Sequence, residues 1–431
     1  MYYTDDVIDE STEQKLLWHL LPLLCLLSMA GTLNRLSLGY AAASVGQALD
    51  ISSTQLGIAE NLFCVGFVVA SLPAAWLMLR LGAKIWITGI TLATAVLALA
   101  HALVWDASSL YAVHLLLGVA EAGLLPAMVY YLMQWMPERH RAKAIAALIG
   151  CAAVVPLVAA PGSDLLLLLG RWFGIDDWQF LFVVEGVPTL WFALIAPGRL
   201  PLTPADARWL PPSERIWLVD QLRQNVRPGA DTRFADGLRG ALTWKLAAVG
   251  GIIGLVGGSL GLWVPLAMQE TGYVPPGVGT GIMIAAGTVG AIAAVTAGLV
   301  SNQRTQWRRA LALFVAVTGV CLGMAAVLPF GIVGVLLLAM VAVIAPAILA
   351  LTWVLGPCIL AGPAAAAGFA VLSAAWTLGY FAAAGLAAVL SDAGMRCLVL
   401  GVACLVVAWL ARGLDGRRPA KLAASPASPG A

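Results

Sequence analysis

Arg35 and Glu121 are charged side chains in the middle of long apolar runs, where each could do chemistry. Arg35 lies in Gly31-Thr-Leu-Asn-Arg-Leu-Ser-Leu-Gly-Tyr40. An arginine at the centre of an apolar helix in lipid costs at least about 2.5 kcal/mol, so it persists where it faces water or a counter-charge. Its planar guanidinium stays charged and matches the two oxygens of a carboxylate. We predict that Arg35 binds an anion, with Thr32 on the same helical face; the alternative is that it snorkels to the membrane surface.

Glu121 lies in the small-residue segment Gly118-Val-Ala-Glu-Ala-Gly123, which permits close helix packing. A carboxyl in such a dry place can bind and release a proton as its surroundings alternate between closed and water-exposed states. His114 precedes it by two turns on the same face, and it could share that proton, contact an anion or simply pack. Glu185 also has apolar neighbours, and we interpret it as structural.

A polar stripe is formed by Ser373, Thr377 and Tyr380, whose spacings of four and three place them on one helical face. Trp353 precedes the pair Gly356-Pro357, a break that could expose backbone groups to a ligand. Ordinary packing between helices is the alternative for both features. The sequence shows no phosphate loop, zinc-ligand spacing or nucleophile elbow, so we expect no metal, no cofactor and no enzymatic activity.

The elements that carry these residues must lie in lipid, because the composition excludes an ordinary soluble domain. Of the 431 residues, 61% are hydrophobic and 11% are charged, and the mean hydropathy is +0.92. The net charge of +2 gives no argument for a nucleic-acid partner. All seven cysteines lie inside apolar runs, which is typical of small hydrophobic residues rather than of a disulfide framework or a metal site.

Apolar runs of about 20 residues predict an all-α membrane protein with twelve transmembrane helices in two six-helix bundles. The expected spans are 17–38, 54–78, 84–104, 108–134, 143–166, 178–197, 243–267, 278–300, 309–329, 332–355, 364–390 and 394–412. A polar stretch rich in proline and arginine separates the halves, and we expect a short amphipathic helix in it. The predicted parts are a disordered tail 1–14, a bundle 15–197, a cytoplasmic central loop 198–242, a bundle 243–412 and a disordered tail 413–431.

The distribution of lysine and arginine predicts the orientation. If both termini and the central loop are cytoplasmic, Arg35 is intramembrane and Arg171 and Arg396 are periplasmic, which leaves 21 of the 24 basic residues on the cytoplasmic side. Basic turns at 79–86 and 301–309 hold equivalent places in the two halves. Such parallel repeats are typical of transporters that rock two bundles about a central site, so we expect a multi-pass protein of the bacterial inner membrane.

Five segments spread over residues 20–390 share a recognisable pattern. They are LLLGVAEAGLLP at 115–126, WQFLFVVEGVP at 178–188, PADARWL at 204–210, LWVP at 262–265 and GPAAAAG at 362–368. With these segments the chain resembles the anion:cation symporters of the major facilitator superfamily, which include permeases for sugar acids, tartrate and phthalate. The resemblance implies that Arg35 anchors the substrate, that Glu121 carries the proton, and that Trp353 lines the site.

The chain departs from the family's pattern at several of the matching positions. Asn34 stands where the family has an aspartate beside the helix 1 arginine, and His114 stands where it has an arginine. Phe67 replaces a tyrosine, and Ser373 and Thr377 replace asparagines. Fewer hydrogen-bonding groups and one fewer cation favour a smaller or more apolar anion than a polyol acid.

Together these patterns predict proton-coupled symport of an organic anion by alternating access, in a chain that functions as a monomer and binds the anion, a proton and the bilayer. An uncoupled facilitator or anion exchanger is an alternative, which the amide at residue 34 favours, and a non-transporting membrane sensor is another. Proton coupling is assigned to Glu121 and His114. The expected substrate-binding residues are Arg35, Thr32, Asn34, Trp353, Ser373, Thr377 and Tyr380.

Overall fold

The computed structural model describes residues 2–224, 233–270, 275, 278–300, 304–328 and 332–412. Every regular element in these ranges is helical, as predicted. In lipid, only helices and closed barrels satisfy all backbone hydrogen bonds internally, which explains why apolar runs of this length fold this way. Among the described residues, 11 helices are long and apolar enough to cross a membrane, and the shorter apolar stretch Val278–Ala293 begins a further one.

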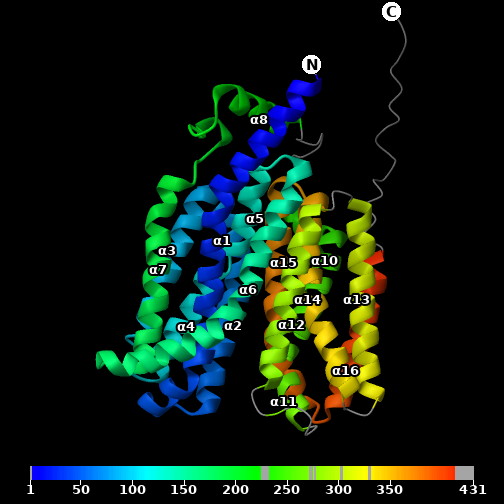
Figure 1. The fold of residues 1–431 in the computed structure, drawn as a ribbon. Helices are drawn as coiled ribbons and strands as arrows, with labels where there is room; N and C mark the ends of the chain where they lie inside the picture. The colour runs from blue at the N-terminus through cyan, green and yellow to red at the C-terminus, as the bar shows by residue number, and fades with distance from the viewer. Residues whose placement is uncertain are drawn as a thin grey trace, which may run out of the picture.

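The first half of the chain supplies the bundle drawn from blue to green in Figure 1. Its helices are α1 (Tyr2–Leu49), α2 (Ser53–Leu81), α3 (Ala83–His101), α4 (Ala107–Glu121), α5 (Leu124–Trp135), α6 (Glu138–Gly170), the 3-10 turn η1 (Arg171–Phe173) and α7 (Asp177–Arg199). The helices α4 and α5 together form one span, Ala107–Trp135.

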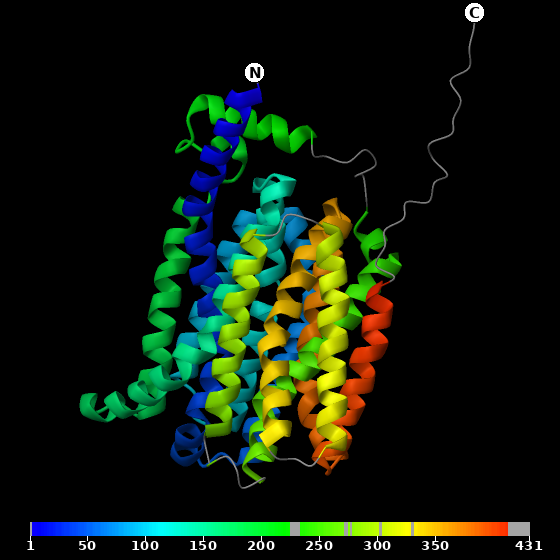
Figure 2. The same ribbon diagram turned by 45° about the vertical axis from the view of Figure 1, so that its right-hand side comes forward.

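The second half supplies the bundle drawn from green to red, beside the first (Figures 1 and 2). Its helices are α10 (Ala241–Leu262), α11 (Val264–Glu270), α12 (Val278–Val300), α13 (Arg304–Val327), α14 (Ile332–Ile359), α15 (Gly362–Val389) and α16 (Ala393–Arg412). Between the bundles the chain forms η2 (Pro204–Asp206), α8 (Pro212–Gln224) and α9 (Phe234–Arg239).

Helix packing repeats from one half to the other. In the first half α1 packs on α6, α2 on α4 and α3 on α7; at the equivalent places of the second half α10 packs on α15, α12 on α14 and α13 on α16. The halves meet where α2 contacts α15 and where α6 contacts α12 and α14. The structure therefore contains the internal repeat that the two basic turns indicate, and it places α2, α5 and α6 of the first bundle against α12, α14 and α15 of the second.

The crossing of α2 and α4 depends on glycine. A Cβ atom at Gly118 would lie 2.2 Å from the carbonyl oxygen of Phe63, and one at Gly66 would lie 2.4 Å from the carbonyl oxygen of Leu115. Any larger residue would push the two backbones apart, as in other membrane helix pairs that use small residues. The small-residue segment around Glu121 thus packs closely, as the sequence predicts.

The N-terminal tail is a correction to the sequence prediction, because residues 2–14 belong to α1 instead of being disordered. Glu13 accepts a hydrogen bond from Lys143 of α6, and Lys15 donates one to Glu214 of α8. These contacts hold the start of α1 against neighbouring helices. The predicted amphipathic helix of the central loop corresponds to α8, which lies with the start of α1 at one end of the molecule (Figure 2). The tail predicted at 413–431 lies outside the described residues.

Candidate functional site

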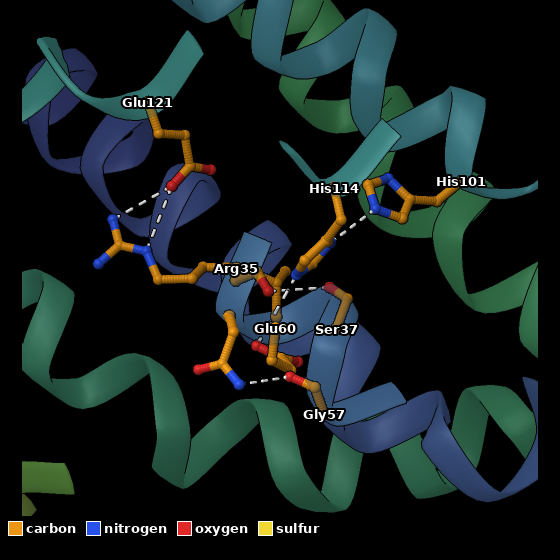
Figure 3. Close-up of polar contacts among 9 residues, drawn as sticks. Arg35, Ser37, Gly57, Glu60, His101, His114 and Glu121 are labelled. Atoms are coloured by element: carbon orange, nitrogen blue, oxygen red, sulfur yellow. Dashed lines mark hydrogen bonds and ion pairs between the residues drawn. The ribbon is translucent and has the colours of Figure 1, made fainter. Parts of the chain in front are cut away.

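Arg35 and Glu121 contact each other between α1 and α4, as Figure 3 shows. Arg35 Nη2 and Nε donate to the same carboxylate oxygen, Glu121 Oε2, at 3.1 Å and 3.3 Å. The Glu121 side chain is 1% exposed and that of Arg35 is 24% exposed. Within the described residues, the buried Oε1 of Glu121 has no hydrogen-bond partner. The two charges that the sequence assigns to separate tasks are therefore direct partners, with one carboxylate oxygen left open.

A break in the fourth span positions Glu121. The helix α4 ends at Glu121, and α5 begins after Gly123 at Leu124. Pro126 lacks an N–H, and its ring would clash with the carbonyl of Ala122 in a continuous helix, so a break here is the expected result. The negative end of the α4 dipole then lies at Glu121, which makes the positive charge of Arg35 the natural partner of an ionised carboxylate.

Aromatic rings from both bundles surround the Arg35 guanidinium. Its Cζ atom lies 5.4 Å from the ring centre of Phe63, 5.6 Å from that of Phe67 and 5.9 Å from that of Trp376. Phe63 and Phe67 belong to α2, whereas Trp376 belongs to α15 of the other bundle. Ring faces attract a cation, and they keep a guanidinium charged without supplying a second counter-ion. Arg35 thus sits at the boundary between the halves.

A second polar group, drawn in Figure 3, contains His114 with His101 and Glu60. His101 Nε2 lies 2.9 Å from His114 Nδ1, and His114 Nε2 lies 3.7 Å from Glu60 Oε2. Both histidines are buried. We overlooked Glu60 and His101 in the sequence, although a carboxylate seven residues inside an apolar span is a signal of the same kind as Glu121.

Two residues predicted to bind the substrate with Arg35 make other side-chain hydrogen bonds in the structure. Thr32 Oγ1 donates to the carbonyl oxygen of Ser28, one turn earlier on the same helix, at 2.9 Å. Asn34 is buried, and its Nδ2 donates to Thr189 Oγ1 of α7 at 3.4 Å. The structure therefore directs Asn34 toward α7, not toward Glu121.

Of the residues expected in the second bundle, Tyr380 is the one that the structure brings to the site. Its ring stacks on Trp376 with 5.6 Å between centres, and it lies within electrostatic range of Arg35 and Glu60. Ser373 and Thr377 are buried in the packing of α15. Trp353 is buried too, and its ring lies 6.0 Å from that of Phe369.

Glu185, which we interpret from the sequence as structural, is held by serines of two helices. Its carboxylate accepts hydrogen bonds from Ser37 of α1 and Ser163 of α6. It borders an apolar cavity of about 320 Å³ between α1, α6 and α7, whose lining includes neither Arg35 nor Glu121. In the described part of the chain no three His, Cys, Asp or Glu side chains gather as a metal site would require.

Residues 23–364 match the Major Facilitator Superfamily. The chain is 29% identical over 369 residues to the protein of Agrobacterium vitis named "Putative tartrate transporter", covering 84% of this chain and 83% of that protein. It is 30% identical over 230 residues to the inner membrane transport protein RhmT of Escherichia coli, covering 53% and 54% of the two chains.

Among solved structures, the fold is similar to that of the proton:xylose symporter XylE, with a TM-score of 0.69 and 15% identity over 93% of this chain and 96% of that one. The predicted architecture of twelve helices in two bundles is confirmed by this likeness and by the family match. A transporter fold also accounts for a charged pair at the boundary between two repeated bundles. The chain belongs to the Major Facilitator Superfamily and is a multi-pass membrane transporter, not an enzyme.

Proposed function

We propose that this transporter carries an organic anion together with a proton, with Arg35 as the anion anchor and Glu121 as the proton carrier. The contact of 3.1 Å between Arg35 Nη2 and Glu121 Oε2 is the observation that carries the proposal. A substrate carboxylate needs the same guanidinium that Glu121 already holds. The substrate therefore replaces the Glu121 carboxylate as the partner of Arg35, and protonation of Glu121 permits this replacement.

The exchange conserves charge inside the membrane. When Glu121 is ionised, its carboxylate neutralises Arg35, and a second anion would meet repulsion. When Glu121 takes a proton on the open Oε1 atom, it loses its hold on Arg35, and the substrate carboxylate can replace it as the partner. The site is neutral in both states, which avoids the cost of an unpaired charge in a place of low dielectric.

Alternating access follows from the position of Arg35 between the bundles. The guanidinium contacts Phe63 of the first bundle and Trp376 of the second. A ligand held there touches both halves, so its binding can favour one arrangement of the bundles over the other. The same aromatic faces favour a short or aromatic carboxylate over a polyol acid, although the relative named above is described as a tartrate transporter.

The location of the chain is part of the proposal. The bacterial relatives and the 21 basic residues expected on one side support a bacterial inner membrane with both termini in the cytoplasm. The start of α1 and the central-loop helix α8 lie at the same end of the molecule, as that orientation requires (Figure 1). In this orientation the turn between α1 and α2 faces the periplasm.

An anion exchanger without net proton coupling is a second candidate, and Asn34 favours it. An amide at this position cannot carry a proton, and its Nδ2 is bonded to Thr189. The two candidates differ in whether a pH gradient alone drives accumulation.

The deciding experiment is uptake of labelled tartrate and benzoate into proteoliposomes with an imposed pH gradient. We expect wild-type protein to accumulate at least one of these anions when the outside is acidic. Glu121→Gln should lose accumulation but keep counterflow, because a permanently neutral side chain leaves Arg35 free for the anion. Glu185→Gln, a carboxyl held by two serines in the same bundle, is the control and should accumulate normally. Unchanged pH-driven uptake in Glu121→Gln would contradict the proton-carrier role.

A further inference from the structure

The side chains of Glu60, His114 and His101 form a row of polar contacts, and the donors and acceptors in the contact between the histidines can be assigned. His101 Nδ1 lies 2.8 Å from the carbonyl oxygen of Leu97, and a carbonyl only accepts, so Nδ1 carries a hydrogen. In neutral His101 the Nε2 atom is then an acceptor. Its neighbour at 2.9 Å, His114 Nδ1, must donate to it. The contact with His101 therefore fixes the tautomer of His114 and leaves His114 Nε2 as a lone pair.

That lone pair faces a carboxylate. His114 Nε2 lies 3.7 Å from Glu60 Oε2, and within the described residues it has no hydrogen-bond partner. His114 is fully buried, whereas the Glu60 side chain is 32% exposed. One added proton would complete the contact in either of two ways, as an imidazolium donating to the carboxylate or as a carboxyl donating to the imidazole. Glu60 is the member of the pair with exposed surface, so a proton would arrive on its side.

The two polar groups lie at different depths. From the end of α1 at Leu49 to Arg35 there are 14 residues, and from the start of α4 at Ala107 to Glu121 there are also 14. Glu60 and His114 each lie seven residues from the starts of α2 and α4, at the same edge of the molecule. At 1.5 Å per residue, Arg35 and Glu121 lie about 21 Å from this edge, whereas Glu60 and His114 lie about 10 Å from it. The pair of Glu60 and His114 therefore lies nearer the edge that we propose to be periplasmic.

The groups that face this pair determine its effect on charge. They are Arg35 on α1, His101 on α3, Glu121 on α4 and Tyr380 on α15. With both carboxylates ionised and the histidines and Tyr380 neutral, one positive and two negative charges leave a net charge of −1. An entering anion meets this excess even after it has replaced Glu121 at the guanidinium. One proton on the pair of Glu60 and His114 removes the excess.

We propose that Glu60 and His114 form a second proton-binding site, whose filling admits the substrate anion, and that His101 is the positioning residue that fixes the tautomer of His114. The proton binds at Glu60 Oε2 or His114 Nε2, which draws the two atoms from 3.7 Å to hydrogen-bond distance, and it enters at the exposed side chain of Glu60. The part concerning the anion rests on the proposed function. The part concerning proton binding does not, and it can be tested without substrate.

The first test detects the proton in substrate-free protein in lipid nanodiscs. Nitrogen-15 histidine spectra and infrared spectra are compared at about pH 8 and about pH 5, the two ends of the range in which an unperturbed imidazole changes charge. We expect either a doubly protonated His114 or a carboxyl stretch from Glu60 to develop on acidification. Glu60→Gln should remove that signal, and Glu185→Gln should leave it. If neither signal develops in wild type, or if the signal persists in Glu60→Gln, the proposal is wrong.

The role of His101 has its own readout. In His101→Leu, Nδ1 of His114 loses its acceptor, so nitrogen-15 spectra at about pH 8 should show both tautomers of His114 instead of one. A merely structural role of His101 would leave the single tautomer in place.

The second test counts protons per tartrate or benzoate in proteoliposomes, from the flux at opposed pH and membrane potentials. We expect the ratio to fall by one proton in Glu60→Gln, with counterflow retained. An unchanged ratio would overturn the coupling of this site to the anion. If no carboxylate is transported by any variant, the proposed function fails, whereas the spectroscopic test still decides whether the proton site exists.

Discussion

Two groups of polar and charged residues include side chains of α1, which are 20 residues apart between Lys15 and Arg35, or about 30 Å along the helix. The end cluster consists of Ser11, Glu13, Lys15, His140, Lys143 and Glu214. The midplane pair consists of Arg35 and Glu121. Both groups join α1 to other helices, but they do so in different surroundings.

The difference lies in the number of partners and in the access of water. Glu13 has two partners, His140 Nδ1 at 2.8 Å and Lys143 Nζ at 3.1 Å. Glu121 has the single partner Arg35, and one of its oxygens has none in the described structure. A carboxylate with two partners, one of them the part-exposed Lys143, can lose one partner at small cost, whereas a buried carboxylate with one partner cannot. The comparison teaches that, with the role we propose for Glu121, an incompletely satisfied charge in a dry place indicates function better than a dense cluster does.

The largest effect should come from breaking the midplane pair on one side only. Arg35→Leu leaves Glu121 buried without its counter-charge, which we expect to destabilise the fold by about 3 kcal/mol and to abolish uptake. The double variant Arg35→Leu, Glu121→Leu should regain most of the stability, because no unpaired charge remains, but no transport. Thermal unfolding in nanodiscs and uptake in proteoliposomes measure the two effects. Equal stability of the single and double variants would show that Glu121 does not depend on Arg35.

A second prediction tests whether the midplane pair depends on the close crossing of α2 and α4. Gly118→Val places atoms against the carbonyl of Phe63, where a Cβ would already lie 2.2 Å away. We expect a destabilisation of about 1–3 kcal/mol by overpacking and a strong loss of uptake, because Phe63 and Glu121 shift. The control is Gly39→Ala on α1, where a Cβ meets nothing within 4 Å. Normal uptake in Gly118→Val would show that the pair of Arg35 and Glu121 does not depend on the close crossing of α2 and α4.

The sequence predicts the parts of the fold that lipid dictates. Span length and apolar composition are enough to place twelve helices, because backbone groups in lipid have few alternatives to a helix. The isolated charges Arg35 and Glu121 could be recognised for the same reason. Their mutual contact could not, since it depends on the crossing of α1 with a span that Pro126 breaks. The disordered tail was predicted wrongly because the partners of Glu13 are about 130 residues away in the chain, as the separation of Lys143 shows.

A smaller effect is expected in the end cluster. Glu13→Gln removes one charge from a group in which Lys143 is 32% exposed. We expect a destabilisation of at most about 1 kcal/mol, which high salt should reduce further, and uptake close to that of wild type. Salt titration of the thermal midpoint measures the effect. A loss of stability as large as that of Arg35→Leu would show that the end cluster and the midplane pair do not differ in the way we propose.

The smallest effect is expected at Asp106, a charge that is fully exposed at the start of α4. Its Oδ1 accepts the backbone N–H of Ser109 at 2.7 Å, and this bond holds the pKa of Asp106 below its ordinary value. The lowered pKa means that the cap stabilises α4 above about pH 4, the range of an unfolded aspartate, and that this stabilisation is lost as the pH falls through the folded-state pKa.

Asp106→Asn keeps a capping side chain without the charge. It is therefore the matched control for the stabilisation of α4 that wild type loses as the pH falls. We expect hydrogen exchange at the Ser109 amide, corrected for its intrinsic rate, to accelerate on acidification in wild type but not in Asp106→Asn. Hydrogen exchange near Glu121 should not accelerate on acidification, because a cap at the water-exposed start of α4 acts within its first turn. If acid loosened both ends of α4 together, charges at the edge and in the midplane would be one coupled system, and the contrast between exposed and buried charges would fail.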